Sequence, residues 1–358
     1  MLEQPLRPVV GTLVFPPTFA PGQGSDDPSG YVIDEIEGRG VVTLDTPGAE
    51  ANRLEPLFMP PKPLAELVPQ ITITAGNQKK NLLELGHRAA DALACSDLKQ
   101  RERIRSAFEE VLLGDYSALA VFAPTSLVVF GAWDSRCTGA KLPRLLEARI
   151  DAYGVELRQR NGQYFSAIDF SEEGLLEYQG PKSRDDPRSK AGFRSTPTKL
   201  KPGGVELVDG GRIVRTLTVH LAGVHRLSAG ADVERGRNLR QYVLGLALAV
   251  ATAPLDLFLR QGCSLVPPKP KEGQAAPKWI AVHFNGSEEE VDLPHQDVVN
   301  YARKARDSFF PSGIKAETWN ATPEGAKAEL ETRLSDSETK RKSKRPKATG
   351  GNPVGTPT

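Results

Sequence analysis

Runs of apolar and polar residues divide the chain into short strands and helices. Apolar, β-branched runs predict strands, and the clearest covers residues 213–221 (IVRTLTVHL). Apolar residues that recur every three or four positions predict helices, and the most apolar of these covers residues 239–253. Further strands are expected at residues 9–15, 40–44, 70–75, 126–130, 149–158 and 279–284, and further helices at 49–58, 81–94, 98–113 and 296–309.

This order of elements predicts an α+β fold. The pairs Gly203-Gly204 and Gly210-Gly211 have the spacing of neither a phosphate-binding loop nor a dinucleotide fingerprint, so we interpret them as turns. A doubly wound nucleotide-binding sheet is therefore disfavoured. We expect one domain over residues 1–330, with a long basic insertion at about 180–211. The polar, basic residues 331–358 are expected to form a disordered tail.

Composition excludes several classes of protein. The three cysteines, Cys95, Cys137 and Cys263, are far apart and form no C-x-x-C pair, which argues against a disulfide scaffold and a thiolate zinc site. We expect no metal and no cofactor. The apolar run over residues 242–253 is shorter than the roughly twenty residues of a membrane span. The N-terminal residues lack the pattern of a secretion signal. We therefore expect a cytoplasmic protein without membrane contact.

Charge is distributed unevenly along a chain whose net charge is +1. Residues 1–60 contain three arginines against nine acidic residues. Basic residues outnumber acidic ones in residues 136–160 (six to three), 180–201 (seven to two) and 212–240 (six to two). A single block of this kind is usually a solvated face, but three in one half of the chain favour a basic surface for a polyanion. Acidic and basic surfaces on one chain also suit head-to-tail contact between copies.

Motifs of catalysis are not found in the sequence. His220 and His225 are five residues apart, whereas two zinc ligands on one helix face need a spacing of four. We expect His220 to be packed or hydrogen-bonded inside a strand. His225, beside Arg226, is better placed to contact a phosphate. We therefore expect a binding protein and not an enzyme.

Several segments, in order, resemble one protein family. They are residues 50–55 (EANRLE), 130–136 (FGAWDSR) continued by 139–144 (GAKLPR), 149–155 (RIDAYGV), and 220–228 (HLAGVHRLS) followed by the apolar helix and 255–266 (LDLFLRQGCSLV). Over about residues 40–270 the chain resembles the backbone subunit of type I CRISPR surveillance complexes (Cascade), in the subtype called G, formerly U, within the RAMP superfamily. The segment at residues 45–50 (DTPGAE) departs from the Ser- and Gln-rich family pattern, and the RNP1 pattern of an ordinary RRM is absent.

The resemblance implies an RRM-like, ferredoxin-like core with long insertions that form a palm and a thumb. It also implies that several copies line a guide RNA (crRNA) as a helical filament and present it to target DNA in antiviral defence. Further partners would be the large subunit, the subunit that caps the 5′ handle, and transiently a helicase–nuclease. A subunit that accepts any guide sequence should grip phosphates and 2′-hydroxyls and leave base pairing to read the sequence.

Candidate RNA-binding residues come from the basic blocks and the family-like segments. They are Asn52, Arg53, Lys79, Lys80, Trp133, Arg136, Lys141, Arg144, Lys190, Arg194, His225 and Arg226. Each has a structural alternative: Arg53 could pair with Glu50 or Glu55, Lys79 and Lys80 could form a solvated turn, and Trp133 could be part of a core. With Lys199, Lys190 and Arg194 would belong either to a thumb or to a solvated loop.

The sequence is compatible with two other functions. One is a metal-independent RNA endonuclease of the RAMP type, with His225 and a Lys or Tyr as general acid and base. The other is a scaffold protein that binds no nucleic acid.

Overall fold

The structure is a computed structural model that describes residues 1–18, 30–129, 131–135, 137–162, 164–177, 187–195, 199–269 and 278–343. It divides into two compact units. The sheet unit comprises residues 1–50, 148–217 and 255–291, and the helical unit comprises residues 51–147, 218–254 and those from 292 onward. We expected one domain over residues 1–330. The sequence concealed the division because the chain passes repeatedly between the units, so that no single linker separates them.

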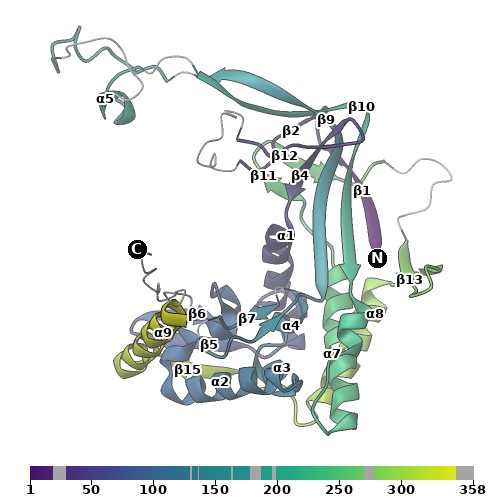
Figure 1. The fold of residues 1–358 in the computed structure, drawn as a ribbon. Helices are drawn as coiled ribbons and strands as arrows, with labels where there is room; N and C mark the ends of the chain where they lie inside the picture. Colours follow the sequence, from purple (N-terminus) through teal and green to yellow (C-terminus); the bar gives the residue numbers. More distant parts are fainter. Residues whose placement is uncertain are drawn as a thin grey trace, which may run out of the picture. The chain divides into compact units, whose positions relative to one another are not determined.

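The sheet unit is built around an antiparallel sheet with the strand order β11-β12-β1-β10-β9-β4-β3, to which β2, β13 and β14 add at the sides (Figure 1). Its elements are β1 (Leu2–Pro8), β2 (Leu13–Val14), β3 (Asp34–Ile36), β4 (Arg39–Asp45), β9 (Leu146–Gly162), α5 (Pro187–Lys190), β10 (Lys199–Val219), β11 (Phe258–Arg260), β12 (Cys263–Val266), β13 (Trp279–Val282) and β14 (Glu288–Val291).

The first strand lies earlier in the chain than the pattern of residues predicted. We expected it at residues 9–15, but β1 covers Leu2–Pro8 and pairs with β10 through Leu2–Leu217 to Leu6–Ile213. Pro5 and Pro8 obscured it, because prolines are normally depleted in strands. Only the short β2 falls within the predicted range.

The strands β9 and β10 run side by side as a long ribbon (Figure 1). β10 begins at Lys199, so the second part of the insertion predicted at 180–211 belongs to this strand. Gly203 and Gly204 lie inside this strand and not in a turn. Gly203 permits the ribbon to pair closely, since a Cβ there would lie 2.7 Å from the Arg158 carbonyl oxygen.

The core of the sheet unit forms from the alternate apolar residues of its strands. Val42 and Leu44 of β4 pack with Ile150 and Ala152 of β9. One charged pair is buried here: Arg215 Nε donates to Glu50 Oε2 at 2.8 Å, and both side chains are at most 5% exposed.

The helical unit contains most of the helices together with two small sheets. Its elements are α1 (Pro47–Leu54), which begins at the unit boundary, η1 (Glu55–Phe58), η2 (Pro63–Leu67), β5 (Ile71–Ala75), β6 (Gln78–Asn81), η3 (Leu82–Glu84), η4 (Arg88–Ala90), η5 (Ala94–Ser96), α2 (Leu98–Leu112), α3 (Ser117–Phe122), α4 (Thr125–Val128), β7 (Ala132–Trp133), β8 (Lys141–Leu142), α6 (Leu221–His225), α7 (Val233–Thr252), α8 (His295–Phe309), β15 (Glu317–Asn320) and α9 (Pro323–Ser343). The sheets have the strand orders β15-β5-β6 and β7-β8.

Two segments of this unit differ in type from their prediction. Residues 126–130 were expected to form a strand but belong largely to the helical turn α4, because a short, fully buried apolar run has no periodicity that separates the two. Residues 81–94 were expected to form one helix but make the three short 3-10 turns η3, η4 and η5. The predicted helix at residues 98–113 is α2, and Asp97 caps it: its carboxylate accepts hydrogen bonds from the backbone N–H groups of Lys99 and Gln100.

The predicted apolar helix α7 is the centre of the helical unit's core and packs along α8. Tyr242 is fully buried, its hydroxyl donates to the Leu67 carbonyl oxygen at 2.8 Å, and its ring stacks on Phe309. Gly245 allows close approach, because a Cβ there would lie 2.9 Å from Ala302 Cα. No helix within the described ranges is both long and apolar enough to cross a bilayer.

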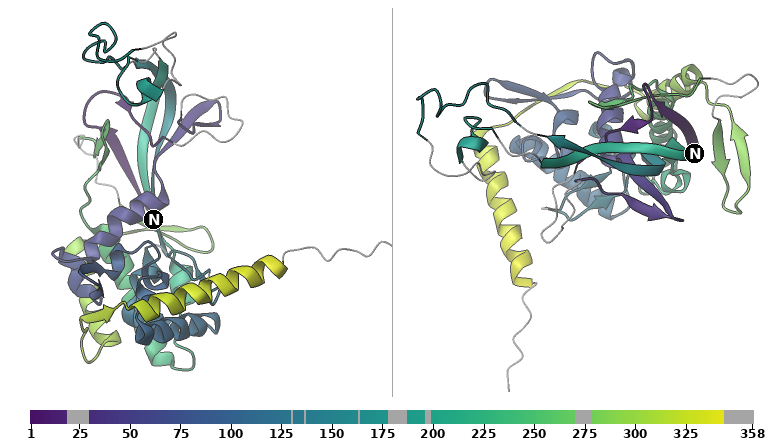
Figure 2. Two further views of the ribbon diagram at one scale, coloured as in Figure 1. Left: turned by 90° about the vertical axis from the view of Figure 1, so that its left-hand side faces the viewer. Right: turned by 90° about the horizontal axis from the view of Figure 1, so that it is seen from above.

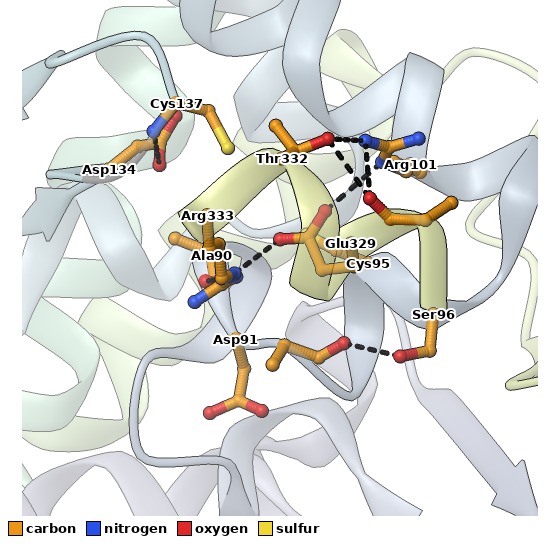
Figure 3. A network of polar contacts seen from close by, with 12 residues as sticks. Ala90, Asp91, Cys95, Ser96, Arg101, Asp134, Cys137, Glu329, Thr332 and Arg333 are labelled. Carbon is orange, nitrogen blue, oxygen red and sulfur yellow. Dashed lines mark hydrogen bonds and ion pairs between the residues drawn. The ribbon is translucent and has the colours of Figure 1, made fainter. Parts of the chain in front are cut away.

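The C-terminal helix α9 corrects the prediction of a disordered tail from residue 331. It continues to Ser343, and its later turns extend away from the rest of the helical unit (Figure 2). Where it packs on the unit, Glu329 is buried between Arg101 and Arg333 (Figure 3). The Arg333 guanidinium also donates to the Ala90 carbonyl oxygen at 3.0 Å. Tertiary ion pairs of this kind are invisible to composition. Residues 344–358 of the predicted tail lie outside the described residues.

Candidate nucleic-acid interface

The hairpin of β7 and β8 carries an exposed aromatic ring beside a cation. Trp133 pairs with Lys141 across the two strands, and Lys141 Nζ lies 5.5 Å from the centre of the indole ring. The Trp133 side chain is 62% exposed. This exposure contradicts the core alternative for Trp133. An indole face next to an ammonium group is suited to stack on a base while the cation contacts a phosphate.

A buried carboxylate shapes the loop of this hairpin. Asp134 is 6% exposed and accepts hydrogen bonds from the N–H groups of Cys137 and Thr138 and from the Thr138 hydroxyl. The Asp134 N–H in turn donates to the Ala140 carbonyl oxygen at 2.9 Å. These hydrogen bonds fix the backbone next to Trp133, and ordering of this kind before a ligand arrives lowers the entropic cost of binding.

Sequence reasoning missed this role of Asp134. The available signal was an aspartate followed at short range by Thr138 and Gly139, residues that are typical of a side-chain-stabilised turn. Gly131, at the base of the hairpin, has φ +71°, and a Cβ there would lie 2.3 Å from the Leu142 carbonyl oxygen. Only glycine fits this position.

The hairpin leads directly to the segment that carries the predicted histidine and arginine. Leu145 follows Arg144; its N–H donates to the Val128 carbonyl oxygen, and its own carbonyl oxygen accepts the His220 N–H at 2.8 Å. His220 precedes α6, whose end carries the exposed His225 and Arg226. In the helical unit, the hydrogen bond between Leu145 and His220 thus links the segment that carries Trp133, Lys141 and Arg144 to the segment that carries His225 and Arg226.

The predicted environment of His220 is wrong. It was expected inside a strand, but β10 ends at Val219 and His220 is exposed in front of α6. The strand ends because the backbone turns there: the Val224 N–H donates to the His220 carbonyl oxygen at 3.1 Å.

Four further candidates lie elsewhere in the helical unit. Asn52 is exposed and Arg53 half-buried in α1. Of the two acids proposed as structural partners of Arg53, Glu50 pairs with Arg215 and Glu55 pairs with Arg88. Lys79 and Lys80 are exposed on β6, and Lys80 Nζ lies 3.8 Å from Glu84 Oε1.

The remaining candidates are only partly described. Arg136 lies outside the described residues. Lys190 ends the short helix α5, with its side chain outside the description, and Arg194 follows as a half-buried residue. Both belong to the segment that connects β9 and β10 in the sheet unit, as does the start of β10 at Lys199.

The described part of the helical unit contains no cluster of metal ligands, and its buried Cys95 is not a reactive thiol. Within those ranges no group of three or more His, Cys, Asp or Glu side chains could hold a metal ion. Burial raises the pKa of the Cys95 thiol to about 12, with the nearby Glu329 carboxylate adding to the shift. A thiol with this pKa is not a nucleophile at neutral pH.

Comparison with known protein families identifies the N-terminal part of the chain. Residues 1–157 match the model of the family described as CRISPR-associated protein GSU0053 (Cas_GSU0053). The matched region includes the Trp133 hairpin and the candidates from Asn52 to Arg144. No curated protein matches the chain. The family match supports a role in CRISPR defence. Residues 1–157 are thus similar to a family of CRISPR-associated proteins, which is consistent with a subunit of a Cascade-type complex.

Proposed function

We propose that the chain is the guide-RNA-binding backbone subunit of a type I-G surveillance complex, acting in the cytoplasm. Copies of it would oligomerise head-to-tail along the guide RNA and present it for pairing with target DNA. The large subunit and the subunit that caps the 5′ handle would complete the particle, and a helicase–nuclease would join it transiently. The sheet unit would provide the RRM-like palm, and the segment that joins β9 to β10, with Lys190 and Arg194, the thumb.

The observation that carries this proposal is the exposed Trp133 beside Lys141 on a hairpin ordered by Asp134. Tryptophan side chains are highly buried on average, so an exposed indole beside a lysine is a candidate for binding a ligand. Stacking accepts any base, and cations accept any phosphate, so this pair provides affinity without sequence selection. That is the requirement for a protein that holds guides of many sequences.

The test uses protein purified from cells that also express a CRISPR repeat–spacer array. We expect a discrete RNA to co-purify. Because aromatic stacking contributes about 1–3 kcal/mol per base, Trp133→Ala should weaken binding of single-stranded RNA by roughly five- to a hundredfold. The control is Trp279→Phe, which alters the half-buried tryptophan of β13. Unchanged RNA content and affinity in Trp133→Ala would contradict the proposed interface.

The two neighbouring cations are tested by salt dependence. Each phosphate contact on a single strand contributes about 0.7 to the slope of log K against log salt, so Lys141→Ala/Arg144→Ala should reduce this slope by about 1.4. Lys62→Ala, which alters an exposed lysine of the same unit, is the control and should leave the slope unchanged. An unaltered slope in the double variant would remove both residues from the interface.

We propose binding and not catalysis, and this part of the proposal has its own test. Incubation of the protein with end-labelled RNA should leave the RNA intact. Cleavage that disappears in His225→Ala would instead support the RAMP-type endonuclease. A particle free of RNA at low salt would support the scaffold alternative.

A further inference from the structure

Two short edge strands of this protein carry opposite charge. β14 contains Glu288, Glu289 and Glu290, all exposed, and in the described part of the chain it pairs only with β13. β6 contains the exposed Lys79 and Lys80, and within the same described ranges it pairs only with β5. Each strand therefore has an outer edge that carries no further strand in the described part of the chain. On β6 the Asn81 N–H at this edge donates to Glu84 Oε2 at 2.6 Å, so that an added strand would align with the lysines before it.

The acidic strand belongs to a hairpin that is ordered without a partner. β13 and β14 pair in continuous register from Trp279–Val291 to Val282–Glu288. The turn is closed by the His283 N–H, which donates to the Ser287 carbonyl oxygen at 2.9 Å, and by Gly286 at φ +81°. At this turn Phe284 is fully exposed. The hairpin thus offers a fixed edge together with an aromatic side chain of the kind that anchors protein interfaces.

The basic strand β6 also belongs to a regular hairpin. β5 and β6 pair in continuous register from Thr72–Asn81 to Ala75–Gln78, and Gly76 makes the turn at φ +55°. β5 is in turn held by the parallel strand β15, through Glu317–Ile71 to Asn320–Thr74. β6 is the outer strand of this three-stranded sheet, and an outer strand is a template for a further strand.

We propose that β14 of one copy adds as a strand to the edge of β6 on a second copy. Opposite charges facing one another across strands are favourable, whereas like charges directly opposite are unfavourable. Two β14 strands or two β6 strands would repel each other, so the unlike pairing is favoured over both. Pairing between two different surfaces is heterologous, and it extends into an open filament when its rotation does not close. This inference rests on the proposed filament and names the surfaces that build it.

The charges already have weak partners within each copy. Glu290 pairs with Lys278, the ring of His283 lies 3.5 Å from Glu289, and Lys80 lies 3.8 Å from Glu84. All these side chains are largely exposed, so exchanging such pairs for intermolecular ones costs little. An alternative role for the charges is protection of each edge from any pairing. The experiment below separates the two roles.

The test is association measured by analytical ultracentrifugation of the full chain, with and without a synthetic single-stranded RNA. The basic-strand variant is Lys79→Glu/Lys80→Glu and the acidic-strand variant is Glu289→Lys/Glu290→Lys. Each should weaken self-association by roughly tenfold or more, because two attractive pairs become repulsive. A control variant, Lys62→Glu/Lys304→Glu, alters exposed lysines of the same unit outside β6 and should associate like the wild type.

Mixing the two variants gives the decisive result. Alone, the basic-strand variant has acidic residues on both strands, and the acidic-strand variant has basic residues on both. In an equal mixture every β14 faces a β6 of opposite charge, so association should return in alternating filaments. Circular dichroism establishes that both variants fold.

Three outcomes would overturn the inference. They are wild-type association of either variant alone, folded variants that stay apart when mixed, and a wild-type chain that binds the RNA but remains monomeric. The last result would leave RNA binding intact, whereas failure of the chain to bind RNA would count against the proposed function itself.

Discussion

Replacing Glu329 by glutamine tests whether a buried ion network holds the C-terminal helix in place. The Glu329 side chain is 3% exposed and contacts Arg101, with Nε to Oε2 at 3.0 Å, and Arg333 of its own helix (Figure 3). The two arginine side chains are only 19% and 11% exposed. Glutamine preserves the shape of the side chain and removes its charge, which leaves two cations close together in a poorly hydrated site.

The expected cost follows from these burials. Removing one partner of a buried ion pair costs about 3–5 kcal/mol. We expect the lower end, about 3 kcal/mol, because both guanidinium groups keep backbone acceptors, Arg101 at Ala328 and Arg333 at Ala90. Converting the network to Arg101→Met/Glu329→Leu/Arg333→Met should be nearly neutral, because apolar packing can replace a buried ion network.

Hydrogen exchange over residues 323–335 and urea unfolding measure the two parts of this effect. Glu329→Gln should accelerate exchange in α9 by roughly a hundredfold, since 1.4 kcal/mol corresponds to a factor of ten. The control is Glu109→Gln, which breaks an exposed i,i+4 pair with Arg105 and should cost about 0.5 kcal/mol or less. If Glu329→Gln exchanges like the wild type and unfolds within about 0.5 kcal/mol of it, the network does not anchor α9.

Three further predictions concern single positions. Gly325→Ala should destabilise the protein by about 1–3 kcal/mol in urea unfolding, because the new Cβ would lie 1.9 Å from the Ser96 carbonyl oxygen. The control Gly48→Ala, whose Cβ would have its nearest atom at 3.9 Å, should be neutral or stabilising, and equal effects of the two substitutions would refute the steric argument. In the native state a maleimide should label Cys137, which is half-buried. It should spare Cys95, whose pKa is about 12, and Cys263, which is fully buried, and rapid labelling of Cys95 before unfolding would contradict its burial. Burial acts to raise the pKa of Glu317, but hydrogen bonds from Arg103 and Trp319 outweigh it and the pKa is lowered. The wild type should therefore be more stable than Glu317→Gln above the unfolded-state pKa of Glu317, and this advantage should disappear as pH falls through the folded-state pKa. A stability difference that does not depend on pH would disprove the linkage.

Elements with a strong local signal were predictable from the sequence. The 3.6-residue pattern of α7 and α8 and the Asp97 cap of α2 act through contacts within a few residues, so the sequence is sufficient to locate them. The α+β class and the strands β4, β5 and β13 follow from the same kind of pattern. The predictions failed where burial removes the periodicity, as at α4, or where prolines occur in a strand that long-range pairing maintains, as in β1.

In the candidate site, too, some features were determined by the sequence and others only by the tertiary structure. The sequence by itself determined which segments carry cations and the family-like motifs, because residue type alone decides charge. Tertiary structure decided that Trp133 is exposed, that Asp134 orders its loop, and that the hairpin leads through Leu145 to α6. It also decided that α9 is helical beyond residue 331, through an ion network whose members are more than two hundred residues apart. Exposure and long-range pairing depend on what the rest of the folded chain covers, and no local pattern of residues contains that information.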